Sequence, residues 1–312
     1  MSAPVSRIVL VAAVAAAASA PPAHAAEGFS GGRAMEHLRT LCDLGPRPSG
    51  SAAMAKQREL LAAHFRAAGA AVAGQAFQVR DRRTGAAVHM ENLIVTWHPD
   101  RRDRVLLAAH YDTRPYPDRD PVDPRGTFVG ANDGASGTAV LMELARFMPA
   151  LEGPVGVDFV LFDAEEYVFG MADPYCLGSA FFARQYAADQ RTGKAPHRYA
   201  CAVVLDMVAD KDLEIWQEGN GMSWPESRPL VEEIWGVAGR LGERRFVPRQ
   251  RHVVEDDHVP LRNIGRIPAC DVIDFAYPQW HTAADTPEHC AAESLEAVGK
   301  VMLEWLRTRR AP

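Results

Sequence analysis

The chain has 312 residues, of which 47% are hydrophobic and 24% are charged, a balance typical of a globular protein. The formal net charge of −6 and the absence of a basic run argue against nucleic acid as a partner. Five cysteines allow at most two disulfides, and no Cys-x-x-Cys pair is present to indicate a cysteine-built zinc site.

The N-terminus has the three parts of a secretory signal. Arg7 provides a positive charge, residues 8–20 form an apolar run, and Ala23-His24-Ala25 is a small-x-small cleavage site. We therefore predict a signal peptide over residues 1–25, a mature domain over residues 26–312, and a secreted or periplasmic location. An uncleaved N-terminal anchor is the alternative. No later segment is apolar enough to cross a bilayer, so no membrane span is expected after cleavage.

Helical and strand patterns alternate along the mature chain. In chain order, the first half predicts helices at 31–44 and 51–68, strands at 72–79, 90–97 and 104–109, a proline-rich loop at 113–125, a helix at 134–148 and a strand at 157–162. The second half predicts a helix at 178–188, strands at 201–205 and 213–216, a helix at 230–241, a strand at 267–273 and a helix at 293–306. This alternation without a linker predicts one α/β domain, a three-layer α/β/α sandwich around a mixed, largely parallel twisted sheet.

Acidic and imidazole side chains follow several of the predicted strands. In open α/β sheets, sites form at the carboxyl ends of the strands, so these side chains are expected to lie close together. They are His110 and Asp112 after the third strand, Glu165 and Glu166 after the fourth, and Asp206 after the fifth.

Two further candidates lie in loops. Asp133 lies in the glycine-rich run 130–137 before a helix, and His281 follows the last strand. Alone, each has an ordinary explanation, such as a helix cap for Asp133 or a surface position for His281. Together, two imidazoles and three carboxylates provide the nitrogen and oxygen donors that suit Zn²⁺. A carboxylate between two half-sites could bridge two ions about 3.5–4 Å apart, and one glutamate would remain as a general base.

Five motifs at these positions together resemble the M28 peptidase superfamily of zinc aminopeptidases and glutaminyl cyclases. The resemblance spans residues 44–306, nearly the whole mature chain, and implies a zinc-exopeptidase-like fold. The motifs are His110-Tyr111-Asp112, Asn132-Asp133-Gly134-Ala135-Ser136-Gly137, Asp163-Ala164-Glu165-Glu166, Leu205-Asp206 and Trp280-His281-Thr282.

The resemblance implies a ligand for each metal position. Asp133, Glu166 and His281 would be the core zinc ligands, with Asp133 as the bridging one. His110 and Asp206 would complete a second zinc site, so one or two zinc ions are expected.

The resemblance also implies roles for residues around the metal. Glu165 would act as the general acid and base, and Asp112 would orient His110. The peptide bond between Asp133 and Gly134 would be cis.

The segment Glu-Asp-Asp-His-Val-Pro at 255–260, together with Trp280, resembles the glutaminyl cyclase branch. In that branch, zinc polarises the side-chain amide of an N-terminal glutamine, and a glutamate moves a proton from the α-amine to the departing ammonia. Asp206 and Asp256 would assist that transfer, and Trp280 would form a wall of the pocket. The implied substrates are peptide or protein N-termini.

Three positions depart from the animal cyclases. Met171, Glu255 and Ala276 stand where those enzymes carry tryptophan, glutamine and phenylalanine. The run 134–137 resembles the aminopeptidase version of its loop, and Glu255 could hold the free α-ammonium of an exopeptidase substrate. A metalloaminopeptidase is therefore the alternative to a cyclase, and a catalytically silent binding relative is a third possibility. The expected substrate pocket contains Trp280, Glu255 and Met171.

Overall fold

The computed structural model describes residues 28–309, so the predicted signal peptide lies outside the described residues. Its strands are β1 (Ala71–Arg80), β2 (Ala87–Trp97), β3 (Asp103–His110), β4 (Gly156–Phe162), β5 (Arg198–Asp206), β6 (Ile215–Gln217), β7 (Phe246–Gln250) and β8 (Ala269–Ile273). Its α-helices are α1 (Gly31–Cys42), α2 (Ala52–Ala67), α3 (Ala135–Leu144), α4 (Leu177–Thr192), α5 (Gly219–Ser223), α6 (Arg228–Leu241), α7 (His258–Asn263) and α8 (Ala292–Thr308). Two 3₁₀ helices are η2 (Ala145–Ala150) and η3 (Pro287–His289). Within this described range, no helix has the length and apolar character needed to cross a bilayer.

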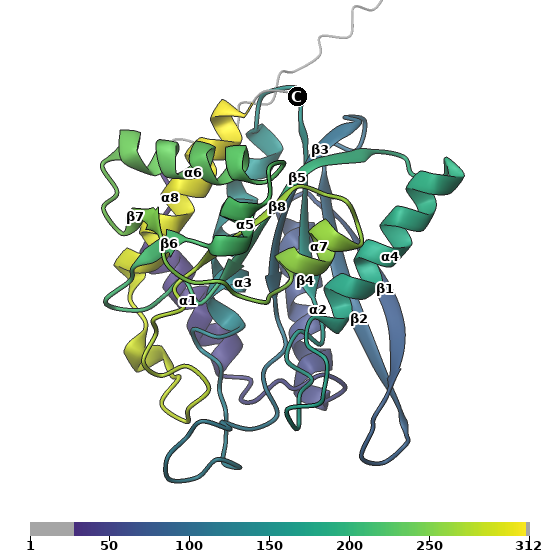
Figure 1. The fold of residues 1–312 in the computed structure, drawn as a ribbon, viewed down its shortest axis with the longest axis vertical. Helices are drawn as coiled ribbons and strands as arrows, with labels where there is room; N and C mark the ends of the chain where they lie inside the picture. The colour runs from purple at the N-terminus through teal and green to yellow at the C-terminus, as the bar shows by residue number, and fades with distance from the viewer. Residues whose placement is uncertain (1–27, 310–312) are drawn as a thin grey trace, which may run out of the picture.

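The main sheet has six strands in the order β1-β2-β4-β3-β5-β8 (Figure 1). The four strands β4, β3, β5 and β8 run parallel, whereas β2 is antiparallel to both β1 and β4. The sheet is therefore mixed and mostly parallel, as predicted. Because the parallel strands share one direction, their carboxyl ends meet at a single edge of the sheet.

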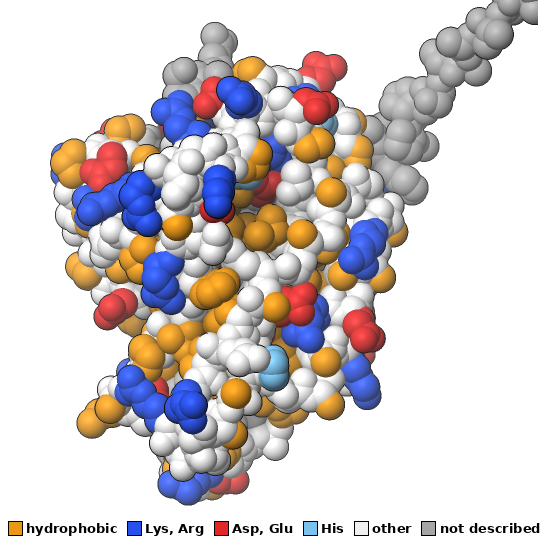
Figure 2. Space-filling view, turned by 90° about the vertical axis from the view of Figure 1, so that its right-hand side faces the viewer, with side chains coloured by type: hydrophobic (Ala, Val, Ile, Leu, Met, Phe, Trp, Pro, Cys, Tyr) orange, Lys and Arg blue, Asp and Glu red, His pale blue; other side chains and the backbone are white. Residues whose placement is uncertain are grey.

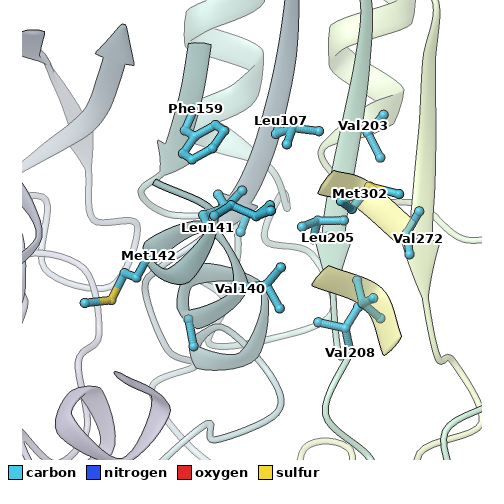
Figure 3. Packing of buried hydrophobic residues seen from close by; sticks show 14 of the residues in the cluster. Leu107, Val140, Leu141, Met142, Phe159, Val203, Leu205, Val208, Val272 and Met302 are labelled. Atoms are coloured by element: carbon cyan, nitrogen blue, oxygen red, sulfur yellow. The ribbon is translucent and has the colours of Figure 1, made fainter. Parts of the chain in front are cut away.

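Helices cover both faces of the sheet, which confirms the three-layer prediction. Leu107 and Val203 point to one face, where they pack with residues of α1, α2, α3, α6 and α8. Figure 3 shows Leu107 near Leu141 of α3, and Val203 near Met302 of α8. Their neighbours in sequence point to the opposite face, against α4 and α7. The strands are thus buried on both sides, which explains their continuous apolar sequences.

The structure differs from the predicted elements in a few places. The helix expected to run to residue 148 changes at Ala145 into the 3₁₀ helix η2, which contains Pro149. The elements α5, β7 and α7 were not predicted, because each has only five or six residues and shows no clear period. All five cysteines are buried and free, so none of the possible disulfides is formed.

The edge of the molecule next to β1 and α4 faces the viewer in Figure 2. Positive and negative side chains are interspersed over this face, with apolar groups exposed between them. The face therefore lacks the single-sign surface that steers binding of a charged polymer.

One buried ion pair ties the centre of the sheet together. Arg104 on β3 binds both carboxylate oxygens of Asp158 on β4, each at 2.8 Å. The hydroxyl of Tyr199 on β5 donates to the same carboxylate at 2.7 Å. All three side chains are buried, so each depends on these partners in place of water.

We predict that Asp158→Ala lowers the free energy of unfolding by about 3–5 kcal/mol, because it leaves the guanidinium of Arg104 buried without its charge partner. Urea unfolding followed by circular dichroism measures the change. The matched control is Asp103→Ala, which removes an exposed pair with Arg198 (3.3 Å) between β3 and β5 and should cost less than about 1 kcal/mol. Equal losses in the two variants would contradict the prediction.

Candidate metal centre and catalytic site

Six of the predicted side chains meet at the carboxyl ends of the parallel strands, at the lower end of Figure 1. All six are buried. They are His110 at the end of β3, Asp133 in the turn before α3, Glu165 and Glu166 after β4, Asp206 at the end of β5, and His281 after β8.

The side chains form two half-sites that share one carboxylate. On one side, His281 Nε2 lies 2.8 Å from Glu166 Oε1 and 3.6 Å from Asp133 Oδ2. On the other side, His110 Nε2 lies 3.2 Å from Asp133 Oδ1 and 3.2 Å from Asp206 Oδ1. Asp133 therefore directs one oxygen at each half-site, which is the arrangement expected of a bridging ligand.

The charges in this cluster depend strongly on one another. Burial and the negative charge of Glu166 raise the pKa of Asp133 to about 8. Burial opposes the ionisation of Glu166, but the positive charges of His281 and Arg114 lower its pKa to about 2. Burial would lower the pKa of His281, whereas Glu166 and its other acidic neighbours raise it to about 9. The positive groups of the protein therefore do not balance the negative charge of these carboxylates, and the raised pKa of Asp133 shows that the cluster favours binding an additional proton.

The donors fit a divalent metal ion. Asp133 Oδ2 and Glu166 Oε2 are buried and accept no hydrogen bond within residues 28–309. His110, Asp133 and Glu166 place ligand atoms within 4.8 Å of one another. Imidazole nitrogens and carboxylate oxygens are ligands that Zn²⁺ prefers, and the ion would supply the missing positive charge.

Asp112 supports both sides of the cluster. Its carboxylate lies 3.5 Å from His110 Nδ1. It also accepts the backbone N–H groups of Glu165 and Glu166, each at 3.1 Å, and the hydroxyl of Ser49 at 3.3 Å. Asp112 therefore fixes the turn that carries the glutamate pair and lies beside the ring of His110.

Asp285 supports the turn that carries Asp133, and the sequence did not predict this role. Its two oxygens accept the backbone N–H groups of Asn132 at 2.8 Å and Asp133 at 3.0 Å. The hydroxyl of Tyr277 donates to the same carboxylate at 2.9 Å. The bridging aspartate is thus held by a residue more than 150 positions away in the chain.

The 113–125 loop, which had no predicted role, contacts the cluster directly. Asp118 Oδ1 lies 3.2 Å from His281 Nδ1, on the opposite side of the ring from Glu166. Arg114 binds Asp118 at 2.7 Å and Glu166 at 3.2 Å. A carboxylate on the second ring nitrogen fixes the orientation of a histidine and makes it a better metal ligand.

Glu165 lies in a row of buried acidic groups beside the metal cluster. Its ligand oxygen lies within 4.8 Å of Asp256 and of the thiol of Cys176, and Asp256 is in turn this close to His258 and Asp271. Burial raises the pKa of Glu165 well above its ordinary value, and the charge of Asp256 adds to the rise although His110 opposes it. Burial likewise raises the pKa of Asp256 to about 6. These carboxyl groups are therefore suited to hold and pass a proton.

A cavity of about 580 Å³ opens next to the cluster, and His281, Trp280 and Met171 are among its lining residues. Trp280 is half-buried, with its ring centroid 4.2 Å from that of His281. Met171 is fully exposed at the rim, so it does not form a wall. Glu255 is exposed and is not among the lining residues of this cavity, although the sequence placed it in the substrate pocket.

The expected cis peptide bond between Asp133 and Gly134 is wrong. No peptide bond among residues 28–309 is cis. The chain turns into α3 through Gly134, whose φ of +96° is accessible to glycine. A side chain there would also lie 2.4 Å from the carbonyl oxygen of Asp112, so glycine is required on two grounds.

Three other turns at the site have left-handed backbones at non-glycine residues. The φ angles are +60° at Ala164, +46° at Met207 and +58° at His281. Each of these residues is a candidate site residue or the neighbour of one. Such strain persists only where the surrounding structure holds it, and it is concentrated at functional sites.

Comparisons with known proteins agree with this geometry. A family model described as peptidase family M28 matches residues 92–306. The structure is similar to the glutaminyl cyclase of Fimbriiglobus ruber, with 40% identity, a TM-score of 0.86, and coverage of 90% of this chain and 96% of that one. It is also similar to a leucine aminopeptidase precursor from Bacteroides thetaiotaomicron VPI-5482, with 27% identity, a TM-score of 0.84, and coverage of 91% and 99%.

A curated relative is matched over part of its length. The glutaminyl-peptide cyclotransferase of Bothrops jararaca is 27% identical over 237 residues, which cover 68% of this chain and 63% of the relative. The chain thus matches less than two thirds of that protein's length.

We predict that Asp118→Asn weakens zinc binding about tenfold, because it removes the charge that orients His281. Competition with a fluorescent zinc chelator measures the affinity. The matched control is Asp120→Asn, which lies in the same loop and accepts the N–H of Ala283 at 2.9 Å without an ion pair to the histidine. If both variants bind zinc as tightly as the unaltered protein, Asp118 has no such role.

Proposed function

This chain belongs to peptidase family M28, and we propose that it is a zinc-dependent glutaminyl cyclase. It would act on peptide or protein N-termini and close an N-terminal glutamine into a lactam with loss of ammonia. Similarity to a solved bacterial glutaminyl cyclase over most of both chains supports this choice. The structural observation that carries it is that the buried carboxyl groups of Glu165 and Asp256 lie within 4.8 Å of each other.

Asp133, Glu166 and His281 would hold the zinc ion. Their donor atoms face one another, and two of the carboxylate oxygens have no other partner within the described part of the chain. When bound there, zinc would polarise the γ-carbonyl oxygen of the glutamine as a Lewis acid.

Glu165 would carry the proton during cyclisation. Its carboxylate would accept the proton that the α-amine loses as the amine nitrogen bonds to the side-chain amide carbon. It would then donate that proton to the amide nitrogen, which leaves as ammonia when its bond to carbon breaks. Burial raises the pKa of Glu165, which makes the carboxylate a stronger base than a solvated glutamate.

Asp256 provides a second buried carboxyl group beside the proposed general acid and base, Glu165. Its oxygen lies within 4.8 Å of that of Glu165, and both side chains are buried. At this separation the negative charge of either carboxylate disfavours the ionisation of the other. The charge of Asp256 would therefore favour the protonated form of Glu165 after Glu165 takes the proton from the amine and before it delivers the proton to the departing ammonia. The charge of Asp206 would raise the pKa of Asp256 in the same way.

Trp280 would contact the aliphatic stem of the glutamine. Its ring packs against Phe275, with centroids 4.7 Å apart, and against His281. This packing fixes the ring beside the proposed zinc position. Met171 and Glu255 are exposed and would not take part in that wall.

A metalloaminopeptidase is the second candidate, and one observation favours it. His110 and Asp206 complete a second half-site on the far side of Asp133, 3.2 Å from each other. Two metal ions bridged by a carboxylate suit hydrolysis, because one ion can hold the attacking water and the other the peptide carbonyl. The similarity to a leucine aminopeptidase precursor agrees with this alternative.

We predict that Glu165→Gln lowers kcat by about 10²–10⁴-fold and leaves zinc content unchanged, because the residue moves protons without binding metal. Ammonia release measures the rate, and elemental analysis measures the zinc. The control is Glu214→Gln, an exposed glutamate that pairs with Arg251 at 3.7 Å outside the site. Full turnover in Glu165→Gln would overturn the mechanism.

We further predict that the zinc-loaded protein releases ammonia from a glutamine-initiated peptide and no free leucine from a leucine-initiated peptide. One zinc ion per chain is expected with cyclisation. Free leucine together with two zinc ions per chain would replace the cyclase by the aminopeptidase. If the zinc-loaded protein releases neither ammonia nor leucine, a binding role is indicated instead.

A further inference from the structure

The cavity beside the metal cluster is rich in positive charge. Four arginines line it, against a single aspartate, Asp118. The chain as a whole has a net charge of −6, so this concentration is local and opposite in sign to the rest of the molecule. The four arginines are Arg83, Arg114, Arg119 and Arg125.

Two of these arginines are already paired with carboxylates. Arg114 is buried and binds Asp118 and Glu166 at 2.7 and 3.2 Å. Arg83 donates to both oxygens of Asp81, at 3.2 and 2.7 Å. Their charges are therefore compensated within the protein.

The other two arginines have no carboxylate partner. Within residues 28–309, no ion pair includes Arg119 or Arg125, and both side chains are exposed. The cavity therefore presents two uncompensated guanidinium groups to whatever enters it.

Arg119 is held close to the proposed reaction centre. Its guanidinium carbon lies 3.9 Å from the centroid of the Trp280 ring, which itself packs on the ring of His281. The backbone N–H of Arg119 donates to the carbonyl of His281 at 3.1 Å. The loop is fixed a second time where Asp120 accepts the N–H of Ala283 at 2.9 Å. One aromatic ring thus separates this arginine from a candidate zinc ligand.

We propose that Arg119 and Arg125 select peptides that carry a carboxylate just after the N-terminal residue, an inference that rests on the proposed function. The N-terminal residue would occupy the metal cluster, and the following residues would lie in the arginine-lined cavity, which His281 and Trp280 also line. A guanidinium pairs with a carboxylate in a planar, two-pronged geometry. The carboxylate belongs either to an Asp or Glu side chain at the next positions or to the C-terminus of a dipeptide.

The test measures kcat/KM of the zinc-loaded protein for two pairs of peptides. Gln-Glu-Phe-amide against Gln-Gln-Phe-amide isolates a side-chain carboxylate, and Gln-Phe against Gln-Phe-amide isolates a terminal one. Each exposed ion pair should favour the acidic member about two- to fivefold, and the preference should shrink as salt is raised. A preference in either pair supports the proposal and identifies the source. Equal rates in both pairs would overturn it.

Variants assign the preference to the two arginines. The double variant Arg119→Gln/Arg125→Gln should bring the ratio of acidic to neutral peptide close to one in both pairs. The matched control is Arg249→Gln, another exposed arginine over a tryptophan, 5.1 Å from the ring of Trp216, which should keep the full ratio. An unchanged ratio in the double variant would contradict the assignment.

A binding measurement separates failure of this proposal from failure of the proposed function. Calorimetry on zinc-loaded Glu165→Gln reports the affinity for the same four peptides without turnover. If the acidic peptides bind more tightly but the unaltered protein does not cyclise them, the role of Arg119 and Arg125 stands and the proposed cyclase activity is overturned. If the protein cyclises the peptides with no preference for the acidic ones in rate or affinity, the cyclase activity stands and the role of Arg119 and Arg125 is overturned.

Discussion

Burial of several carboxylates at one edge of the sheet is the constraint on which the rest of the site depends. Asp133, Glu165, Glu166, Asp206 and Asp256 all lie in the interior, and charges of one sign cannot be brought together there without compensation. The protein compensates in three ways: with the positive charges of the two histidines and Arg114, with backbone N–H groups, and with carboxyl groups such as Asp133 and Glu165 whose raised pKa lets them retain a proton. A metal ion would be a fourth source of the same positive charge.

The surrounding loops can be understood as the supports of this cluster. Asp112 holds the turn after β4, Asp285 holds the turn before α3, and Asp118 contacts the ring of His281. These supports allow the left-handed backbones at Ala164 and His281 to persist, because each strained residue lies next to a position that is fixed from outside. Rigidity at the site therefore comes from Asp112, Asp118 and Asp285, carboxylates that would not bind the metal themselves.

The sequence predicted the strands and the side chains that follow them, His110, Glu165, Glu166 and Asp206, because buried parallel strands have a clear apolar signature and a common direction. Asp118 and Asp285 were missed since their partners lie far away in sequence, and no local pattern distinguishes them from ordinary loop acids. Glu255 was placed in the pocket by resemblance, but the course of its loop leaves it exposed and outside the cavity lining, whereas Met171 lines the cavity at its exposed rim. Loop geometry, unlike strand direction, is not encoded in a short period.

The five buried thiols have a consequence for how this fold can be made and kept. None is cross-linked, and burial raises the pKa of Cys42 and of Cys201 to about 12 each, so neither forms a thiolate readily at neutral pH. Thiol–disulfide exchange requires that thiolate and access to it. The native chain is therefore expected to be indifferent to the redox potential of its surroundings, and its stability does not depend on a covalent cross-link. Oxidative mispairing is confined to the interval before the core closes over the cysteines.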